Sequence, residues 1–132
     1  MGNRIQTVNI KRDMPTVGEA RQRLKEVLIA AKRDQVAVIK LIHGYGSSGV
    51  GGALRDALRK SLRLRVKDRL IAGFIPGESW SIFDPSVRRL QDLYPELARD
   101  SDLTSQNPGM TIILMDSQAG EPRQNPSSGC RG

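Results

Sequence analysis

The chain has 132 residues, a formal net charge of +7, one histidine, one cysteine and only 4% aromatic residues. This length suits one domain with a real core, and a single cysteine excludes a disulfide-stapled secreted fold. No apolar run approaches the roughly 20 residues of a membrane span, and the first residues lack the apolar stretch of a signal peptide. We therefore expect a cytoplasmic monomer that does not bind membranes.

The first part of the chain alternates between strand and helix patterns. Residues 4–10 alternate apolar and polar side chains, which predicts a short strand. Thr16 and Glu19 have the spacing of a capping box, and apolar residues at helical spacing follow as far as Ala31. A nearly continuous apolar run from Val36 to Ile42 then predicts a buried strand.

The stretch after this buried strand carries the strongest functional signal. Five glycines fall within the nine residues 44–52, and a helical pattern with arginines at steps of four follows them. Glycine lets the backbone approach an anion and turn its N–H groups inward, and the helix N-terminus adds about half a positive charge. The pattern predicts a site for a phosphate-bearing ligand, formed by Gly44, Gly46, Ser47, Ser48, Gly49, Arg55, Arg59 and Arg63.

The remainder predicts two more strands, at residues 69–76 and 110–115, the latter interior. The long excursion between them contains Asp84 and Pro85, which are typical of a helix start, and Pro95, which breaks or restarts that helix. Residues 117–132 are rich in Ser, Gly, Pro and Gln and are expected to form a disordered tail, so that the domain spans residues 1–116.

The excursion also holds Trp80 and Phe83. We interpret both rings as anchors that fasten the excursion to the core. Stacking on nucleic-acid bases is the alternative.

Together the elements predict an α/β fold (an α+β two-layer sandwich) with a mixed four-stranded sheet and two main helices on one face. The order is βαβαββ, with a helical insertion before the last strand. The two helical crossovers predict parallel pairing among the first three strands, and the apolar second strand is expected at the centre. The glycine loop then lies at the carboxyl edge of the sheet, where open α/β sheets bind ligands.

The segment IHGYGSSGVGGALRDALRKSL resembles the second signature of the Smr (small MutS-related) domain, His-Gly-x-Gly followed by a glycine and then Leu-Arg. TVGEARQRLKEVL resembles the helix after that family's first signature, and GMTIILM resembles its final strand. The resemblance covers about residues 5–116. It implies a compact α/β domain that binds DNA or RNA and, in some members, nicks it.

One stretch departs from the family pattern. The first signature of the family is Leu-Asp-x-His-Gly at the end of strand one, whereas this chain has Val8-Asn9-Ile10-Lys11-Arg12. Asn9 replaces the acid and Lys11 replaces the histidine, so the chemistry of those groups does not carry over. Lys11 and Arg12 are good phosphate ligands, and the sequence therefore predicts that binding is retained.

His43 is the one side chain with an ordinary pKa near neutrality, which makes it the candidate catalytic acid or base. Asp13, on the same end of the sheet, is the candidate second group. We expect weak or absent cleavage, with any turnover dependent on His43. Two alternatives stay open: a metal-independent phosphodiesterase or endonuclease that uses His43, and a basic module that docks an acidic protein. His43 could also be a structural histidine that bonds loop carbonyls.

Cofactor motifs are not supported. Residues 44–49 match the dinucleotide fingerprint, but the next strand ends in Phe74-Ile75-Pro76, where that fold requires an acid. A P-loop would need Gly-Lys-Ser/Thr at the end of the loop. With one histidine and no close group of acids near the loop, we expect neither a metal nor a cofactor.

Overall fold

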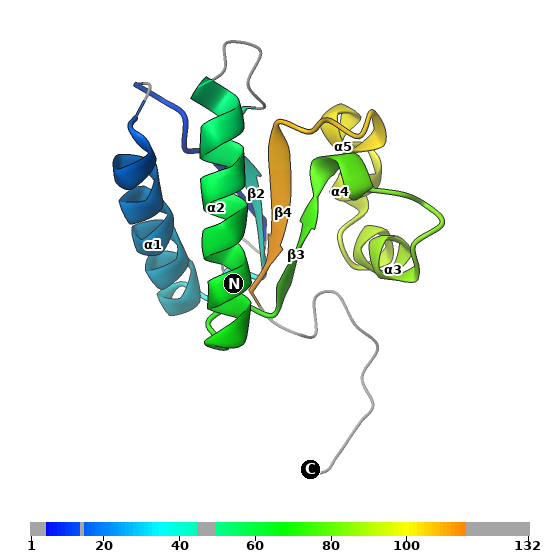
Figure 1. Ribbon diagram of the computed structural model, residues 1–132. Coiled ribbons are helices and arrows are strands. Elements are labelled where there is room, and N and C mark those ends of the chain that lie inside the picture. Colours follow the sequence, from blue (N-terminus) through cyan, green and yellow to red (C-terminus); the bar gives the residue numbers. More distant parts are fainter. Residues whose placement is uncertain (1–4, 14, 45–49, 116–132) are drawn as a thin grey trace.

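The computed structural model describes residues 5–13, 15–44 and 50–115. The elements follow in the order β1 (Ile5–Asn9), α1 (Val17–Arg33), β2 (Val38–Ile42), α2 (Val50–Lys67), β3 (Gly73–Pro76), η1 (Gly77–Ser79), α3 (Pro85–Leu93), α4 (Pro95–Ala98), α5 (Ser101–Thr104) and β4 (Met110–Leu114) (Figure 1). This order confirms the predicted βαβαββ arrangement with a helical insertion before the last strand. The tail expected at residues 117–132 lies outside the described residues.

The four strands form one mixed sheet in the order β1-β2-β4-β3. β1 pairs with β2 in parallel, and β4 is antiparallel to both β2 and β3. The central position of β2 is confirmed. Parallel pairing among the first three strands holds only for β1 and β2, because β4 lies between β2 and β3. Every residue of β4 is buried, whereas every residue of β3 is partly exposed, so burial favours β4 in the interior of the sheet.

α1 begins where the sequence indicates. The Thr16 hydroxyl accepts a hydrogen bond from the Glu19 N–H at 3.1 Å, and the Glu19 carboxylate accepts from the Thr16 N–H at 2.9 Å. This reciprocal pair is the predicted capping box, and it satisfies two backbone donors at the start of the helix. Hydrogen bonding by the Thr16 backbone is the main cause that lowers the pKa of Glu19.

β3 is shorter than the predicted strand at residues 69–76. The residues before it are hydrogen-bonded to the last turn of α2: the Arg69 N–H donates to the Val66 carbonyl and the Leu70 N–H donates to the Arg65 carbonyl, both at 3.0 Å. Arg69 has a φ of 63°, a left-handed conformation that ends the helix. The strand therefore starts only at Gly73.

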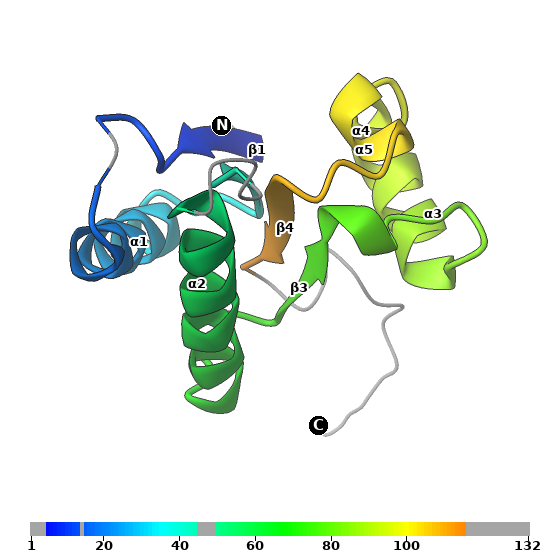
Figure 2. The ribbon, with the colours of Figure 1, turned by 45° about the horizontal axis from the view of Figure 1, so that its top comes forward.

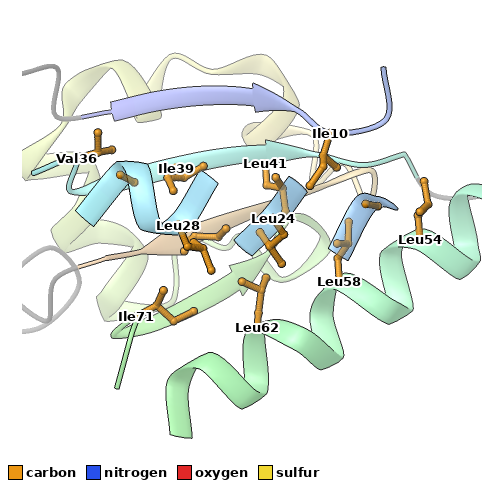
Figure 3. Packing of buried hydrophobic residues seen from close by; sticks show 13 residues of the cluster. Ile10, Leu24, Leu28, Val36, Ile39, Leu41, Leu54, Leu58, Leu62 and Ile71 are labelled. Atoms are coloured by element: carbon orange, nitrogen blue, oxygen red, sulfur yellow. The ribbon is translucent and has the colours of Figure 1, made fainter. Parts of the chain in front are cut away.

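α1 and α2 lie side by side on one face of the sheet, as predicted (Figure 2). Leucines from both helices point toward β2 in a continuous core, shown in Figure 3. The buried members that the figure labels are Ile10, Leu24, Leu28, Val36, Ile39, Leu41, Leu54, Leu58, Leu62 and Ile71. Burial of this apolar surface is the main source of stability for the helix layer.

The insertion covers the opposite face of the sheet and builds a second core there, which adds a layer to the predicted two-layer arrangement. Val38 and Ile112 alternate with the residues of the first core, so β2 and β4 are buried on both faces. The anchoring interpretation is correct for Trp80, which is 2% exposed, and wrong for Phe83, which is 86% exposed. The insertion is also tied to the sheet by Lys40, whose ammonium group lies 2.7 Å from an Asp100 carboxylate oxygen.

Candidate nucleic-acid interface

The parallel strands β1 and β2 end at the same edge of the sheet, and this edge brings predicted site residues together. The Ile10 N–H donates to the Ile42 carbonyl at 2.9 Å, which extends the pairing just past the end of β1. The next N–H, that of Lys11, donates to the Asn9 side-chain oxygen at 3.1 Å. Asn9 therefore serves as a turn residue here. The edge carries Lys11, Arg12 and Asp13 on one side and His43 and Gly44 on the other.

Lys11 lies against the start of the glycine loop. Gly44 has a φ of +78°, and a Cβ built there would lie 3.5 Å from the Lys11 Cδ. The aliphatic part of Lys11 therefore passes over the one described residue of the loop that needs a left-handed backbone. Lys11, Arg12 and Asp13 are all exposed, and Asp13 itself has a φ of 64°.

Arg23 of α1 stabilises this turn through hydrogen bonds. Its guanidinium donates to the Arg12 carbonyl at 2.7 Å and to the Ile10 carbonyl at 3.4 Å. Both carbonyls belong to the connection between β1 and α1. The cations at positions 11 and 12 are thus carried by a turn whose backbone is held by the helix layer.

The His-Gly pair is fixed to β4. The backbone N–H groups of His43 and Gly44 both donate to the Gly109 carbonyl, each at 2.9 Å. Gly109 directly precedes β4, so the start of the glycine loop depends on the return of the chain from the insertion. Both donors are satisfied within the protein, and neither is left to face an anion.

The His43 ring is fully buried and hydrogen-bonded at both nitrogens. Its Nδ1 lies 2.6 Å from the Gly44 carbonyl oxygen and its Nε2 lies 2.8 Å from the Thr111 hydroxyl oxygen. A carbonyl can only accept, so Nδ1 carries the proton. In the neutral ring Nε2 then accepts from the Thr111 hydroxyl.

Burial lowers the pKa of His43 to about 4. The hydrogen bond to the Gly44 carbonyl favours the charged ring and opposes this effect, whereas the positive charges of Arg59 and Arg55 add to it. Glu78 opposes it weakly. At neutral pH the ring is uncharged, and the interpretation of His43 as a structural histidine agrees with this geometry.

Arg59 is held within the protein. Its guanidinium forms two bonds to the Glu78 carboxylate, at 2.6 and 2.8 Å, and its Nε donates to the Thr111 hydroxyl at 3.2 Å. Only 11% of the side chain is exposed. These bonds also lower the pKa of Glu78, mainly through the hydrogen bond from Arg59. Arg59, Thr111 and His43 therefore form one directional chain of hydrogen bonds.

The arginines of α2 do not form one free stripe. Arg55 is near enough to His43 to affect its pKa, and its Nε is 3.6 Å from the Asp56 carboxylate. Arg63 is exposed but lies about 12 Å beyond Arg55 along the helix axis. The other predicted loop residues, Gly46, Ser47, Ser48 and Gly49, lie outside the described residues.

Sequence reasoning missed three residues of this edge: Thr111, Glu78 and Gly109. Thr111 carries the one hydroxyl within the apolar last strand, and a fully buried threonine needs a hydrogen-bond partner. The sequence therefore contained a signal that could have identified Thr111. The sequence contains no such signal for Glu78 or Gly109, because their contacts depend on how the insertion returns to the sheet.

Two features are absent from the described residues. They contain no group of three His, Cys, Asp or Glu side chains arranged to hold a metal ion. Among the same residues, no helix has both the length and the apolar character needed to cross a membrane.

Comparison with known proteins gives two findings. The family model of the Smr domain matches residues 12–79, just over half of the chain. The structure is similar to the crystal structure of the Smr domain of Thermus thermophilus MutS2, with a TM-score of 0.52 and 21% identity over 84% of this chain and 98% of that one. At this identity the similarity shows a shared fold. No curated protein matches the sequence.

Proposed function

This chain belongs to the Smr domain family, and on that premise we propose that it binds DNA or RNA through phosphate groups at the edge where β1 and β2 end. The observation that carries the proposal is the position of Lys11 against Gly44, which puts a cation beside the start of the glycine loop. α2 begins six residues after Gly44 and has no acid in its first turn, so its positive end is not neutralised by its own side chains.

Each group at this edge has a distinct role in the proposal. Lys11, Arg12 and Arg55 supply positive charge. The glycine loop, including Gly46, Ser47, Ser48 and Gly49, supplies N–H and hydroxyl donors to phosphate oxygens. These bonds are to the backbone of the nucleic acid, so they position the ligand without reading its bases.

The proposal departs from the sequence expectation for two arginines. Arg59 already binds Glu78 and Thr111, and we assign it to positioning His43 and the start of the loop. Arg63 is too far along α2 to reach a phosphate held at the loop.

The proposed activity is binding without appreciable cleavage. A general base needs a free lone pair within reach of the substrate, and the Nε2 lone pair of His43 is directed to Thr111 inside the protein. With a pKa of about 4, the ring is also a minor source of protons at neutral pH. Asp13 is exposed and near Lys11 and Arg12 in sequence, and the buried, neutral His43 ring is not a proton donor that could act with it.

A salt titration tests binding. Affinity for single-stranded RNA, duplex RNA and DNA is measured for the wild type and for Lys11→Gln/Arg12→Gln. Removing one phosphate interaction should lower the slope of log affinity against log salt by about 0.9 on duplex DNA and about 0.7 on single strands. The matched control, Lys32→Gln/Lys67→Gln, removes the same charge from the last turns of α1 and α2. Equal losses of affinity in both variants would contradict a site at the edge.

A cleavage assay separates binding from catalysis. Labelled RNA is incubated with the wild type, His43→Asn and Asp13→Asn, with and without a chelator. Asn at position 13 tolerates the left-handed backbone, and Asn at position 43 can still donate to the Gly44 carbonyl. We expect no cutting above the buffer control. Cutting that disappears in His43→Asn would support the phosphodiesterase alternative, and cutting that persists would indicate a different catalytic group.

A further inference from the structure

We infer that the groove between α1 and α2 is a second contact surface for nucleic acid, which holds the backbone of a single strand whose neighbouring phosphate lies at the Lys11–Gly44 edge. The inference rests on the proposed function and deepens it, since it specifies the form of nucleic acid and the direction in which the strand leaves the edge.

The groove has the shape and lining that this ligand requires. Its volume is about 310 Å³, and Leu24 and Leu28 form its apolar floor. The cations that line it are Arg21 and Lys25 from α1 and Arg65 from α2. Gln22 and Ser61 add polar groups that can bond phosphate or sugar oxygens, and none of the described residues that line the groove is a carboxylate. A ligand that presents anionic groups along an extended chain matches this lining.

The cations of the groove are incompletely paired. In the described part of the chain, neither Arg21 nor Lys25 forms an ion pair. The Nε of Arg65 is buried without a hydrogen-bond partner, and its guanidinium meets Asp68 only at 3.4 Å. About 30% of the Arg65 side chain is exposed, so its terminal nitrogens can donate to an oxygen ligand in the groove.

Two described acids, Glu26 and Asp68, lie beside the groove and not in its lining. Glu26 accepts a hydrogen bond from Gln22 at 3.2 Å, and Asp68 lies beyond Arg65 at the end of α2. Neither carboxylate lines the groove. The positive field inside it is therefore not cancelled by its own walls.

The groove leads away from the proposed site. Gly18, in the first turn of α1, lines it, and the connection that carries Lys11 and Arg12 runs directly into that turn. Figure 1 shows α1 and α2 side by side, both starting at the top of the view. Gly18 and Lys25 are about 10 Å apart along the helix axis. A strand that leaves Lys11 can thus follow the groove.

A single strand fits this surface better than a duplex does. A channel between two packed helices admits a flexible backbone, and a positively charged groove that tracks the backbone is the usual means of binding single strands. A stiff duplex meets the rims of such a groove but does not enter it. We therefore expect preference for single strands when the ligand is long enough to fill the groove.

The test varies ligand length. Fluorescence anisotropy measures the affinity for oligouridines of about 4 and about 12 nucleotides, one at the lower limit and one well inside the range of site sizes of single-strand-binding domains. The groove variant is Arg21→Gln/Lys25→Gln, in which glutamine preserves helix propensity at two exposed positions. The wild type should bind the longer strand more tightly. The groove variant should lack that gain and keep the affinity for the shorter strand. Its salt slope on the longer strand should fall by about 0.7 for each phosphate that is no longer neutralised.

Control variants separate this inference from the proposed function. Lys32→Gln/Lys67→Gln, with the same charge change outside the groove, should retain the gain with length. Lys11→Gln/Arg12→Gln should weaken the binding of both strands.

Two outcomes overturn the inference and leave the edge site standing: a groove variant that binds both strands like the wild type, or a wild type that prefers duplex RNA of equal length. A wild type that binds no nucleic acid overturns the proposed function. Thermal unfolding of each variant confirms that it is folded.

Discussion

At the scale of single residues, His43 connects three segments of the chain. Its ring joins the end of β2 to Thr111 of β4, and Thr111 in turn accepts a hydrogen bond from Arg59 of α2. Each group in this network donates a hydrogen bond to the next. Arg59 donates to Thr111, Thr111 donates to His43, and His43 donates to the Gly44 carbonyl. Such a network stabilises one geometry of the edge only while the ring is neutral, because a proton on Nε2 would oppose the Thr111 hydroxyl hydrogen.

Stability should therefore depend on pH through His43. Its pKa is about 4 in the folded state and near 6.5 when unfolded, so the unfolded chain binds more protons between these values. Stability should thus fall as the pH is lowered from 6.5 towards 4, by up to about 3 kcal/mol. Urea unfolding at pH 7, 6 and 5 measures this slope, which should be shallower in His43→Asn. Equal slopes in the two proteins above pH 5, where carboxylates contribute little, would contradict the assignment.

At the scale of elements, both long helices end with a non-glycine residue in a left-handed conformation. After α1, Gln35 has a φ of 60°. Its N–H donates to the Lys32 carbonyl at 3.3 Å, and the Val36 N–H donates to the Ala31 carbonyl at 2.9 Å. This is the Schellman pattern, in which the left-handed position is usually glycine. The helix end is therefore well bonded but strained at one residue.

Gln35→Gly should stabilise the protein. The left-handed conformation costs a residue with a Cβ about 1–2 kcal/mol, and the greater entropy of glycine in the unfolded chain offsets part of the gain. A net increase of about 0.5–1 kcal/mol in the free energy of unfolding is expected from these terms. Urea denaturation measures it. Gln35→Ala is the matched control, since it shortens the side chain but keeps the Cβ, and a glycine variant no more stable than the alanine variant would argue against strain.

At the scale of the whole molecule, the sheet separates two cores, and Lys40 joins the smaller one to the sheet. Its ammonium group bonds Asp100 at 2.7 Å and Asp102 at 3.1 Å, both from the insertion. Burial alone would lower the pKa of Lys40, but the two carboxylates outweigh it and raise that pKa. Asp100 also caps α5, so the same carboxylate attaches the insertion to the sheet and stabilises the start of a helix.

Lys40→Met should loosen the insertion more than the helix layer. The change removes charged hydrogen bonds worth about 1.5–3 kcal/mol each, although partial exposure of Asp102 reduces the loss. We expect a loss of about 1–3 kcal/mol in total and faster hydrogen exchange in residues 80–109 than in α1. Asp102→Asn on the Lys40→Met background should restore part of the stability by removing an unpaired charge. Uniformly faster exchange across both cores would contradict a local role for this ion pair.

Local features of the fold could be predicted from the sequence. The capping box at Thr16, the helix start at Asp84 and Pro85, the new helix at Pro95 and the buried second strand all agree with the structure. Each depends on residues within about one turn of each other or on a short run of apolar side chains, so the neighbouring sequence suffices to specify it. The family was also accessible, because the His-Gly-x-Gly motif is specific. The position of Lys11 at the same edge as the His-Gly pair follows from the parallel pairing of β1 and β2.

The tertiary structure alone decided which groups at that edge remain free. β4 entered the sheet between β2 and β3, which put Thr111 beside His43 and buried the ring. The insertion brought Glu78 to Arg59, so the guanidinium of this predicted phosphate ligand is bonded within the protein. The insertion also closed a second core over the opposite face. These partners are 19 to 68 residues apart in the chain, and periodicity within short segments contains no information about such pairs, because only packing of the complete sheet brings them together.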